Sequence, residues 1–252
     1  MMCRSGEEVM IMSAGVATGL VTGIQSARAP APATRDRILL AGFHSEAGQA
    51  IAAALADRGA RLVVQAACAS DAVAIATGRL AGRAPAISLY TGALATRADA
   101  LATTQAAIRS LGGLDAAVIV MDVTSDGLAA AVRSGDIEEA VAAALGAPLE
   151  MIRVAANRMG VTWTRGTIVV VLVEPAGLCA RSQLVLGVIK SALAGMVRGE
   201  AARLAGDEIR VVAVSATAAP DAGCVPDVGG LIVALTGSGE GALSGVVFDA
   251  VA

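Results

Sequence analysis

The residue of this sequence with the clearest chemical potential is Lys190, in the stretch L-V-L-G-V-I-K-S-A-L-A-G at 184–195. It is the only lysine of the 252 residues, and all its neighbours in this stretch are uncharged. An ammonium group that is buried without a partner costs several kcal/mol. We therefore expect that Lys190 reaches into a hydrated cleft, pairs with a carboxylate, or binds a ligand. The carboxylates expected near it are Glu46, Glu174 and Asp122.

Other reactive side chains are sparse. The four cysteines (Cys3, Cys68, Cys179 and Cys224) are far apart in sequence and form no C-x-x-C pair. Such spacing is typical of free thiols in a reducing compartment, so we expect a cytoplasmic protein. His44 is the only histidine, and the sequence therefore predicts no metal site. A net charge of −3 and an aromatic content of 2% give no basic, aromatic-lined surface for nucleic acid.

Residues 1–35 are predicted to lie outside the folded domain, as an extension that is disordered or that precedes the true start. The run A-P-A-P-A at 29–33 is typical of a stiff linker between an extension and a domain. The domain is expected to span residues 36–252. No internal repeat divides this part of the chain.

The apolar run 9–24 is interpreted as part of that extension. It contains three glycines and is short for a membrane span, so we expect no membrane contact. The acidic residues Glu7 and Glu8 stand where a signal peptide carries positive charge. A start of the protein at Met12 is the alternative interpretation.

Strand and helix patterns alternate through the domain. Short runs rich in Val, Ile and Leu predict buried strands, and alanine-rich segments ended by glycine predict helices. Strands that are apolar on both faces indicate a parallel sheet covered by helices on both sides. The sequence thus predicts a single α/β domain with a Rossmann-type, doubly wound sheet of about seven strands. Strands are expected at 37–42, 61–65, 86–90, 114–121, 167–173, 209–215 and 246–249, and helices at 48–58, 70–80, 97–111, 137–158, 183–205 and 226–235.

The order and spacing of these elements resemble the short-chain dehydrogenase/reductase family over residues 37–250. The best matching segments are 38–64, L-G-G-L-D-A-A-V-I-V at 111–120, G-T-I-V-V-V-L-V at 166–173, and 190–214. The resemblance implies an NAD(P) cofactor and a proton-transfer site made of Ser, Tyr, Lys and Asn side chains. Each functional position must then be compared separately, because a fold does not fix a function.

The cofactor-binding positions depart from the family pattern. The family turn resembles T-G-x-x-x-G-x-G, and here A-G-F-H-S-E-A-G at 41–48 keeps Gly42 and Gly48 but places Glu46 at the middle glycine. We expect Glu46 to cap the following helix in the former anion site, or to be a solvated surface residue. No charged residue occurs in 65–68, where the family carries a ribose-binding side chain. The sequence predicts no cofactor in this chain, with NAD(P) held by a partner subunit or only weakly here.

The catalytic positions are also depleted. Relative to the family motif, the tyrosine position is Leu186, the serine position is Val173 and the asparagine position is Ala144, so only Lys190 is retained. Aliphatic side chains carry no transferable proton, and the general acid–base chemistry of the family is not available to them. Lys190 is then best interpreted as a relic that extends into the empty cofactor cleft.

Three neighbouring hydroxyls do not replace the missing groups. Ser182, Thr164 and Thr167 have no histidine or carboxylate at an activating spacing. The family's strand-end motif and substrate lid are also missing, since V-A-V-S-A-T at 212–217 is followed by only a short stretch before the last helix. A short loop is expected to leave a substrate uncovered.

These departures predict a non-catalytic subunit that assembles with an active family member. The assembly would be a mixed dimer or tetramer formed through helices 137–158 and 183–205. The second helix is apolar on more than one face, which indicates burial beyond the chain's own core. Its apolar residues are Leu184, Leu186, Val188, Ile189, Leu193 and Met196. The resemblance offers the hydroxyacyl-CoA dehydrogenase of anaerobic toluene degradation, where one subunit type lacks a working site, as a candidate complex.

Two alternatives remain open from the sequence. The first is an NAD(P)-dependent oxidoreductase with an atypical active site, which binds the cofactor around Gly42 and Gly48. The second is a ligand sensor on the same scaffold. Cofactor titration separates both of them from a non-catalytic subunit.

Overall fold

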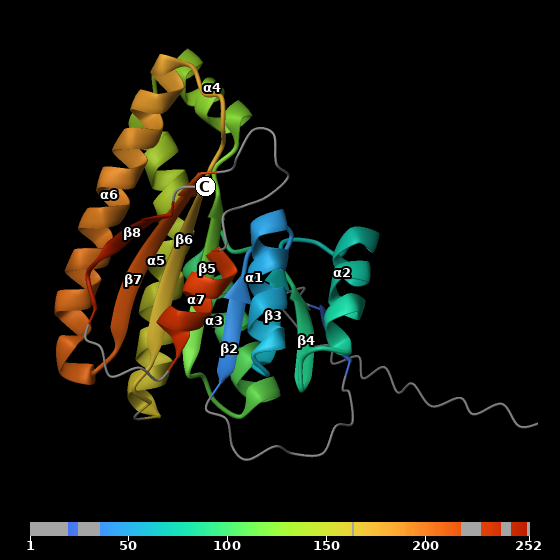
Figure 1. Cartoon of the computed structure of the whole chain (residues 1–252). Helices are drawn as coiled ribbons and strands as arrows, with labels where there is room; N and C mark the ends of the chain where they lie inside the picture. Colours follow the sequence, from blue (N-terminus) through green and yellow to red (C-terminus); the bar gives the residue numbers. More distant parts are fainter. Residues whose placement is uncertain (1–19, 25–35, 163, 218–227, 238–242, 251–252) are drawn as a thin grey trace, which may run out of the picture.

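The protein is built on one eight-stranded sheet with the order β1-β4-β3-β2-β5-β6-β7-β8 (Figure 1). The computed structural model describes residues 20–24, 36–162, 164–217, 228–237 and 243–250. Strands β2 to β8 pair in parallel, which confirms the predicted Rossmann-type sheet. These strands are β2 (Arg37–Ala41), β3 (Arg61–Ala66), β4 (Ala86–Thr91), β5 (Ala116–Asp122), β6 (Thr167–Glu174), β7 (Arg210–Thr217) and β8 (Val247–Ala250).

One strand lies within the segment that the sequence assigned to an extension. Strand β1 (Leu20–Ile24) pairs antiparallel with β4 at the edge of the sheet, with Leu20 opposite Thr91 and Ile24 opposite Ile87. The apolar run that contains it shows no strand-like alternation, so the sequence pattern does not separate it from the surrounding residues. The rest of segment 1–35 lies outside the described residues.

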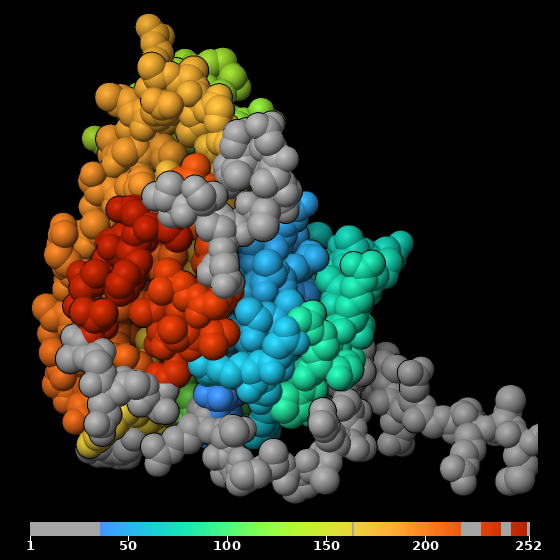
Figure 2. All heavy atoms as spheres, viewed as in Figure 1, coloured from blue at the N-terminus to red at the C-terminus, as the bar shows by residue number. Residues whose placement is uncertain are grey.

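Helices cover both faces of the sheet, because alternate strand residues point to opposite sides. Leu40 belongs to a buried cluster that also contains residues of α1, α2 and α7, whereas Leu39 belongs to the cluster on the other face, with residues of α3, α5 and α6. On the first face, α1 and α7 lie side by side (Figure 2). The helices are α1 (Glu46–Asp57), α2 (Asp71–Ala81), α3 (Arg97–Leu111), α4 (Ser125–Ser134), α5 (Ile137–Val161), α6 (Ala180–Leu204) and α7 (Val228–Thr236).

Helix α4 has no counterpart among the predicted elements. It begins after Thr124, whose side chain accepts a hydrogen bond from the Gly127 N–H, and ends at Gly135 in a left-handed conformation. Leu128 and Ala131 are its buried residues. A helix with a single buried turn gives only a weak periodic pattern of apolar residues in the sequence. The glycine at position 127 weakens the helix prediction further, because glycine is unfavourable inside a helix.

The strand order changes direction between β2 and β5. Strands β3 and β4 follow β2 toward one edge of the sheet, and β6, β7 and β8 follow β5 toward the other edge. Ligands of doubly wound folds bind at such a switch point, outside the carboxyl ends of the strands. Here the two carboxyl ends are Ala41 and Asp122. Among the described helices, none combines the length and apolar character needed to cross a membrane.

Candidate functional site

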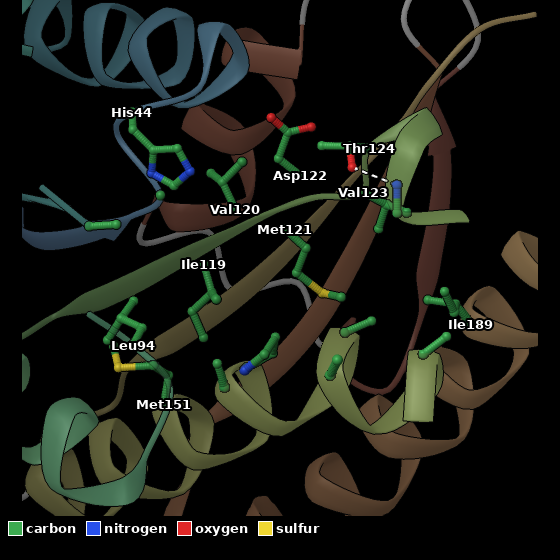
Figure 3. A pocket seen from close by; sticks show the side chains of 18 of the residues that line it. His44, Leu94, Ile119, Val120, Met121, Asp122, Val123, Thr124, Met151 and Ile189 are labelled. Atoms are coloured by element: carbon green, nitrogen blue, oxygen red, sulfur yellow. Dashed lines mark hydrogen bonds between the residues drawn. The ribbon is translucent and has the colours of Figure 1, made fainter. Parts of the chain in front are cut away.

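A cavity of about 400 Å³ opens at the switch point between β2 and β5 (Figure 3). The turn after β2, the end of β5, helix α4 and the first half of α5 form its walls. In Figure 3, His44 and Asp122 lie on one side of β5, and Leu94 and Met151 lie on the other. The cavity therefore passes across the sheet edge at the place where the fold class binds its ligands.

The two glycines retained from the family turn are required by backbone packing. Gly42 has φ +89°, and a Cβ atom there would lie 2.6 Å from the carbonyl oxygen of Val120 on β5. A Cβ atom on Gly48 would lie 2.3 Å from the carbonyl oxygen of Gly42. Both distances are too short for any side chain. The glycines thus bring the turn, helix α1 and β5 together whether or not a ligand is bound.

Ser45, and not Glu46, caps helix α1. The Ser45 hydroxyl accepts a hydrogen bond from the Gly48 N–H at 3.0 Å and donates one to the Gly42 carbonyl at 3.0 Å. Glu46 is the first residue of the helix and its side chain is exposed. Of the two roles expected for Glu46, the cap is wrong, because the shorter serine side chain already fills the capping position, and the exposed surface residue is the one observed. Glu46 still places negative charge on the first turn.

Gln65, at the end of β3, connects three strands across the sheet edge. Its Oε1 accepts a hydrogen bond from the Gly42 N–H at 3.1 Å, and its Nε2 donates to the Gly92 carbonyl at 2.6 Å. The Gln65 carbonyl also accepts from the Phe43 N–H at 2.8 Å. The sequence indicated only that no charge was present here. The structure shows an uncharged amide that is buried and bonded at both ends.

The three residues predicted to replace the family's catalytic side chains lie in different surroundings. Ala144 of α5 lines the cavity, and Leu186 of α6 is buried in the core on that face of the sheet. Val173 is buried on the opposite face, among residues packed under α1 and α7. The next residue, Glu174, is the one that turns toward α6 and Lys190. The structure thus brings a carboxylate, rather than the predicted valine position, beside the retained lysine.

Lys190 is paired with two carboxylates. Its Nζ lies 2.6 Å from Glu174 Oε1 and 3.4 Å from Asp249 Oδ1 on β8. The Ser215 hydroxyl of β7 also donates to Glu174. Of the three predicted carboxylates, only Glu174 is used. The relic interpretation, in which the ammonium extends into an empty cleft, is therefore not the arrangement observed.

The charge balance around Lys190 keeps it protonated. Partial burial lowers the pKa of Lys190, but the hydrogen bond and the charge of Glu174, together with Asp249, outweigh this effect. The net result is a pKa above the ordinary lysine value. A lysine that binds and releases a proton near neutral pH needs the opposite shift. In this arrangement the lysine acts as a fixed positive charge.

The nearby hydroxyls are not activated by a base within the described residues. Thr167 accepts a hydrogen bond from Arg210, and the Thr164 hydroxyl is bonded to that of Thr162. Ser182 lies 3.4 Å from the Sγ atom of Cys179. Its hydroxyl holds the pKa of the exposed Cys179 thiol below the ordinary value.

The described part of the chain contains two free thiols, on Cys68 and Cys179, and both are exposed. No group of three or more His, Cys, Asp or Glu side chains is arranged there to hold a metal ion. The predicted short lid lies mostly outside the described residues, since β7 ends at Thr217 and α7 begins at Val228.

A family profile described as enoyl-(acyl carrier protein) reductase matches residues 42–222, which is most of the chain. No curated protein matches the sequence. The turn from Gly42 onward and strand β5, which both line the cavity, lie within the matched region.

Many solved structures share the fold. A short-chain type dehydrogenase/reductase from Mycobacterium marinum has a TM-score of 0.71 at 18% identity, covering 86% of this chain and 94% of that chain. The NADH-dependent reductase A1-R', solved in complex with NAD, has a TM-score of 0.69 at 17% identity, covering 84% of this chain and 93% of that chain. A protein from Sinorhizobium meliloti 1021 described as a short-chain dehydrogenase/reductase has a TM-score of 0.68 at 20% identity, covering 87% and 97%. At these identities the likeness establishes the fold.

Proposed function

Because the chain belongs to the short-chain dehydrogenase/reductase family, we propose that it is a non-catalytic subunit that assembles with and supports an active family member. The observation that carries this proposal is the replacement of proton-transfer groups by hydrocarbon. Leu186, Val173 and Ala144 occupy the positions of the family's tyrosine, serine and asparagine. Lys190, the group that remains, is held by Glu174 and Asp249. Leu186, Val173 and Ala144 have no proton to exchange with a substrate carbonyl, and the pKa of Lys190 is shifted away from neutrality by its carboxylate partners.

The donor set at the switch point does not fit a dinucleotide. Among the described residues that line the cavity there is no lysine or arginine, and Asp122 contributes a carboxylate. Glu46 adds a second carboxylate at the start of α1, where the family places a pyrophosphate. The end of β3 offers Gln65, which is already hydrogen-bonded at both ends of its amide. We therefore assign cofactor binding to the partner subunit.

The surface proposed for assembly is the outer face of α5 and α6. Leu186, Ile189 and Leu193 of α6 are buried in the chain's own core. Leu184 and Val188 point outward and are 63% and 40% exposed. Exposed apolar side chains that are aligned one helical turn apart are typical of a surface that a partner covers.

The outer face also carries an ordered charge cluster at its far end. Glu200 is buried, and its carboxylate accepts hydrogen bonds from Arg153 of α5 at 3.3 Å and from Arg203 at 2.6 Å. These contacts join the two helices into one rigid surface. A rigid surface reduces the entropy lost when a partner binds.

The partner is defined by its chemistry. It is a short-chain dehydrogenase/reductase with an intact Tyr-x-x-x-Lys motif, in the same reducing, cytoplasmic compartment, and a hydroxyacyl-CoA dehydrogenase is the candidate offered by the sequence resemblance. The family member encoded nearest to this gene is the first to test. Co-expression of the two chains followed by size-exclusion chromatography should give a mixed dimer or tetramer. The activity of the complex should depend on the partner's tyrosine and be insensitive to Lys190→Met.

Two outcomes would contradict the proposal. One is a chain that stays monomeric and separate from every intact family member tested. The other is saturable NADH binding at micromolar concentration by the isolated chain, together with turnover of a carbonyl or alcohol that Lys190→Met abolishes. The second outcome would favour the alternative of an oxidoreductase with an atypical site.

A further inference from the structure

We propose that the cavity at the switch point binds an uncharged, mainly aliphatic small molecule, such as a medium-chain alcohol. This inference is independent of the proposed subunit role, because the cavity lies inside one chain. It concerns the switch point, where doubly wound folds bind dinucleotides, and it assigns a different ligand class to that place.

The walls of the cavity are hydrocarbon. Large apolar side chains come from the loop before α3, from β5, from α4 and from both long helices. They are Leu94, Ile119, Met121, Leu128, Met151 and Ile189. The floor on α5 consists of alanines and Pro148, so no polar group projects from it. Sites with this lining recognise ligands chiefly by burial of apolar surface.

Two of the polar side chains that line the cavity, Gln65 and Thr124, are already hydrogen-bonded within the protein. Gln65 uses both ends of its amide on backbone partners, and Thr124 accepts from the Gly127 N–H at 3.1 Å. Water in such a space has few partners, and an apolar ligand that displaces it loses few hydrogen bonds. A ligand with several polar groups would leave them unpaired.

The charge at the cavity decides against an anionic ligand. Asp122 lines the cavity and is exposed, as is His44 from the β2–α1 turn. No lysine or arginine lies among the described lining residues to offset that carboxylate. A fatty acid or a phosphorylated ligand would bring a second negative charge toward Asp122. A hydroxyl head group can instead donate a hydrogen bond to it.

The volume sets the size of the ligand. About 400 Å³ is at the lower end of the range for small-molecule sites, which is roughly 300–1,000 Å³. A chain of about ten carbons is of this order, whereas a dinucleotide is much larger. The probe is therefore 1-decanol, and decanoate, which has the same chain length but carries a negative charge, is the comparison ligand.

The test is a calorimetric titration of the full-length protein with 1-decanol, 1-octanol and decanoate. We expect saturable one-to-one binding of decanol, weaker binding of octanol by at least about fivefold because two methylenes are lost, and binding of decanoate at least about tenfold weaker than decanol. Asp122→Asn should strengthen decanoate binding by removing the charge repulsion, and it should weaken decanol binding only slightly because the amide oxygen can still accept a hydrogen bond. The difference in affinity between decanol and decanoate should therefore shrink. Because Asp122 is exposed, this variant is expected to fold normally.

The cavity itself is tested by Ala144→Phe, which fills it, against Ala142→Phe on the same helix, where residue 142 is exposed and does not line the cavity. Decanol binding should fall at least about tenfold in the first variant only. Circular dichroism checks that both variants are folded. Absence of saturable decanol binding by the parent protein, equal binding by both phenylalanine variants, or displacement of decanol by NADH would each overturn the inference.

Discussion

The ammonium nitrogen of Lys190 lies 2.6 Å from Oε1 of Glu174, and it joins helix α6 to the end of strand β6. Ser215 of β7 donates to the same carboxylate, and Asp249 of β8 lies 3.4 Å from the ammonium. One lysine thus connects a helix to the carboxyl ends of three neighbouring strands. Its presence in an otherwise lysine-free chain is explained by this structural role, without any catalytic step.

Lys190→Met should destabilise the fold. Glu174 is buried and would lose its main charged partner, and an uncompensated buried carboxylate is costly. Because the Lys190 side chain is 35% exposed, solvent reduces the effect. We expect the free energy of unfolding to fall by about 2 kcal/mol, as measured by urea denaturation.

The double variant Lys190→Met with Glu174→Gln separates the ion pair from general packing. If the two groups stabilise each other, the double variant should lose less stability than the sum of the two single variants. Strict additivity would show that the pair contributes nothing.

The stabilisation by Lys190 should depend on pH in one direction. Its pKa is raised in the folded protein, so its contribution is complete below the ordinary lysine pKa of about 10.4 and is lost as the pH rises through the folded value. The difference in unfolding free energy between the parent and Lys190→Met should be constant from about pH 7 to 9 and shrink above about pH 10.5. A difference that grows with pH would contradict the ion-pair account.

The fold could be predicted from the sequence because its main signals are local. Strands such as Thr167–Glu174 are buried on both faces, and helices such as α3 and α4 end at a glycine, Gly112 and Gly135 respectively. Strand β1 and helix α4 were missed because neither segment has a clear periodic pattern, and α4 has only two buried residues, Leu128 and Ala131. Helix α5 continues through Pro148, and its apolar pattern on both sides of the proline predicted this correctly.

The site was harder to predict, because its contacts join residues distant in sequence. Glu174 was one of three expected partners of Lys190, but Asp249 lies on a strand 59 positions away and gives no local signal. Side-chain direction at the end of β6 placed Glu174, rather than Val173, toward α6. The cap on α1 could have been found, since Ser45 stands three residues before Gly48, the common spacing for a serine cap.

Gly48→Ala should be far more damaging than Gly78→Ala, although both glycines lie in helices. A methyl group on Gly48 would meet the Gly42 carbonyl oxygen at 2.3 Å, whereas one on Gly78 would meet nothing within 4 Å. We expect a loss of at least about 2 kcal/mol for the first and a gain of about 0.5–1 kcal/mol for the second. Thermal and chemical unfolding measure both. A neutral Gly48→Ala would mean that the turn is retained for a ligand instead of for packing.

Leu184→Glu should prevent assembly through α6 while leaving the chain folded. Leu184 is 63% exposed, so the change costs little in the isolated chain, but it would place a charge in the proposed interface. Ile75→Glu is the matched control, because Ile75 is 56% exposed on α2, away from the long helices. Size-exclusion chromatography with light scattering should show loss of the complex for Leu184→Glu only. Equal behaviour of the two variants would remove α6 from the interface.

Asp115→Asn should weaken the start of the sheet, where β2 and β5 meet. The Asp115 carboxylate accepts hydrogen bonds from the Arg37 backbone N–H at 3.0 Å, from Nε at 2.9 Å and from Nη2 at 2.7 Å. Such charge-assisted, paired contacts are strong when partly buried, and the Asp115 side chain is only 15% exposed. We expect urea denaturation to show a loss of about 1–3 kcal/mol. Asp57→Asn removes a similar paired contact to Arg83 on the exposed surface, and it should change stability little, because water screens that pair. If both variants lose the same stability, burial is not what makes the Arg37–Asp115 contact important.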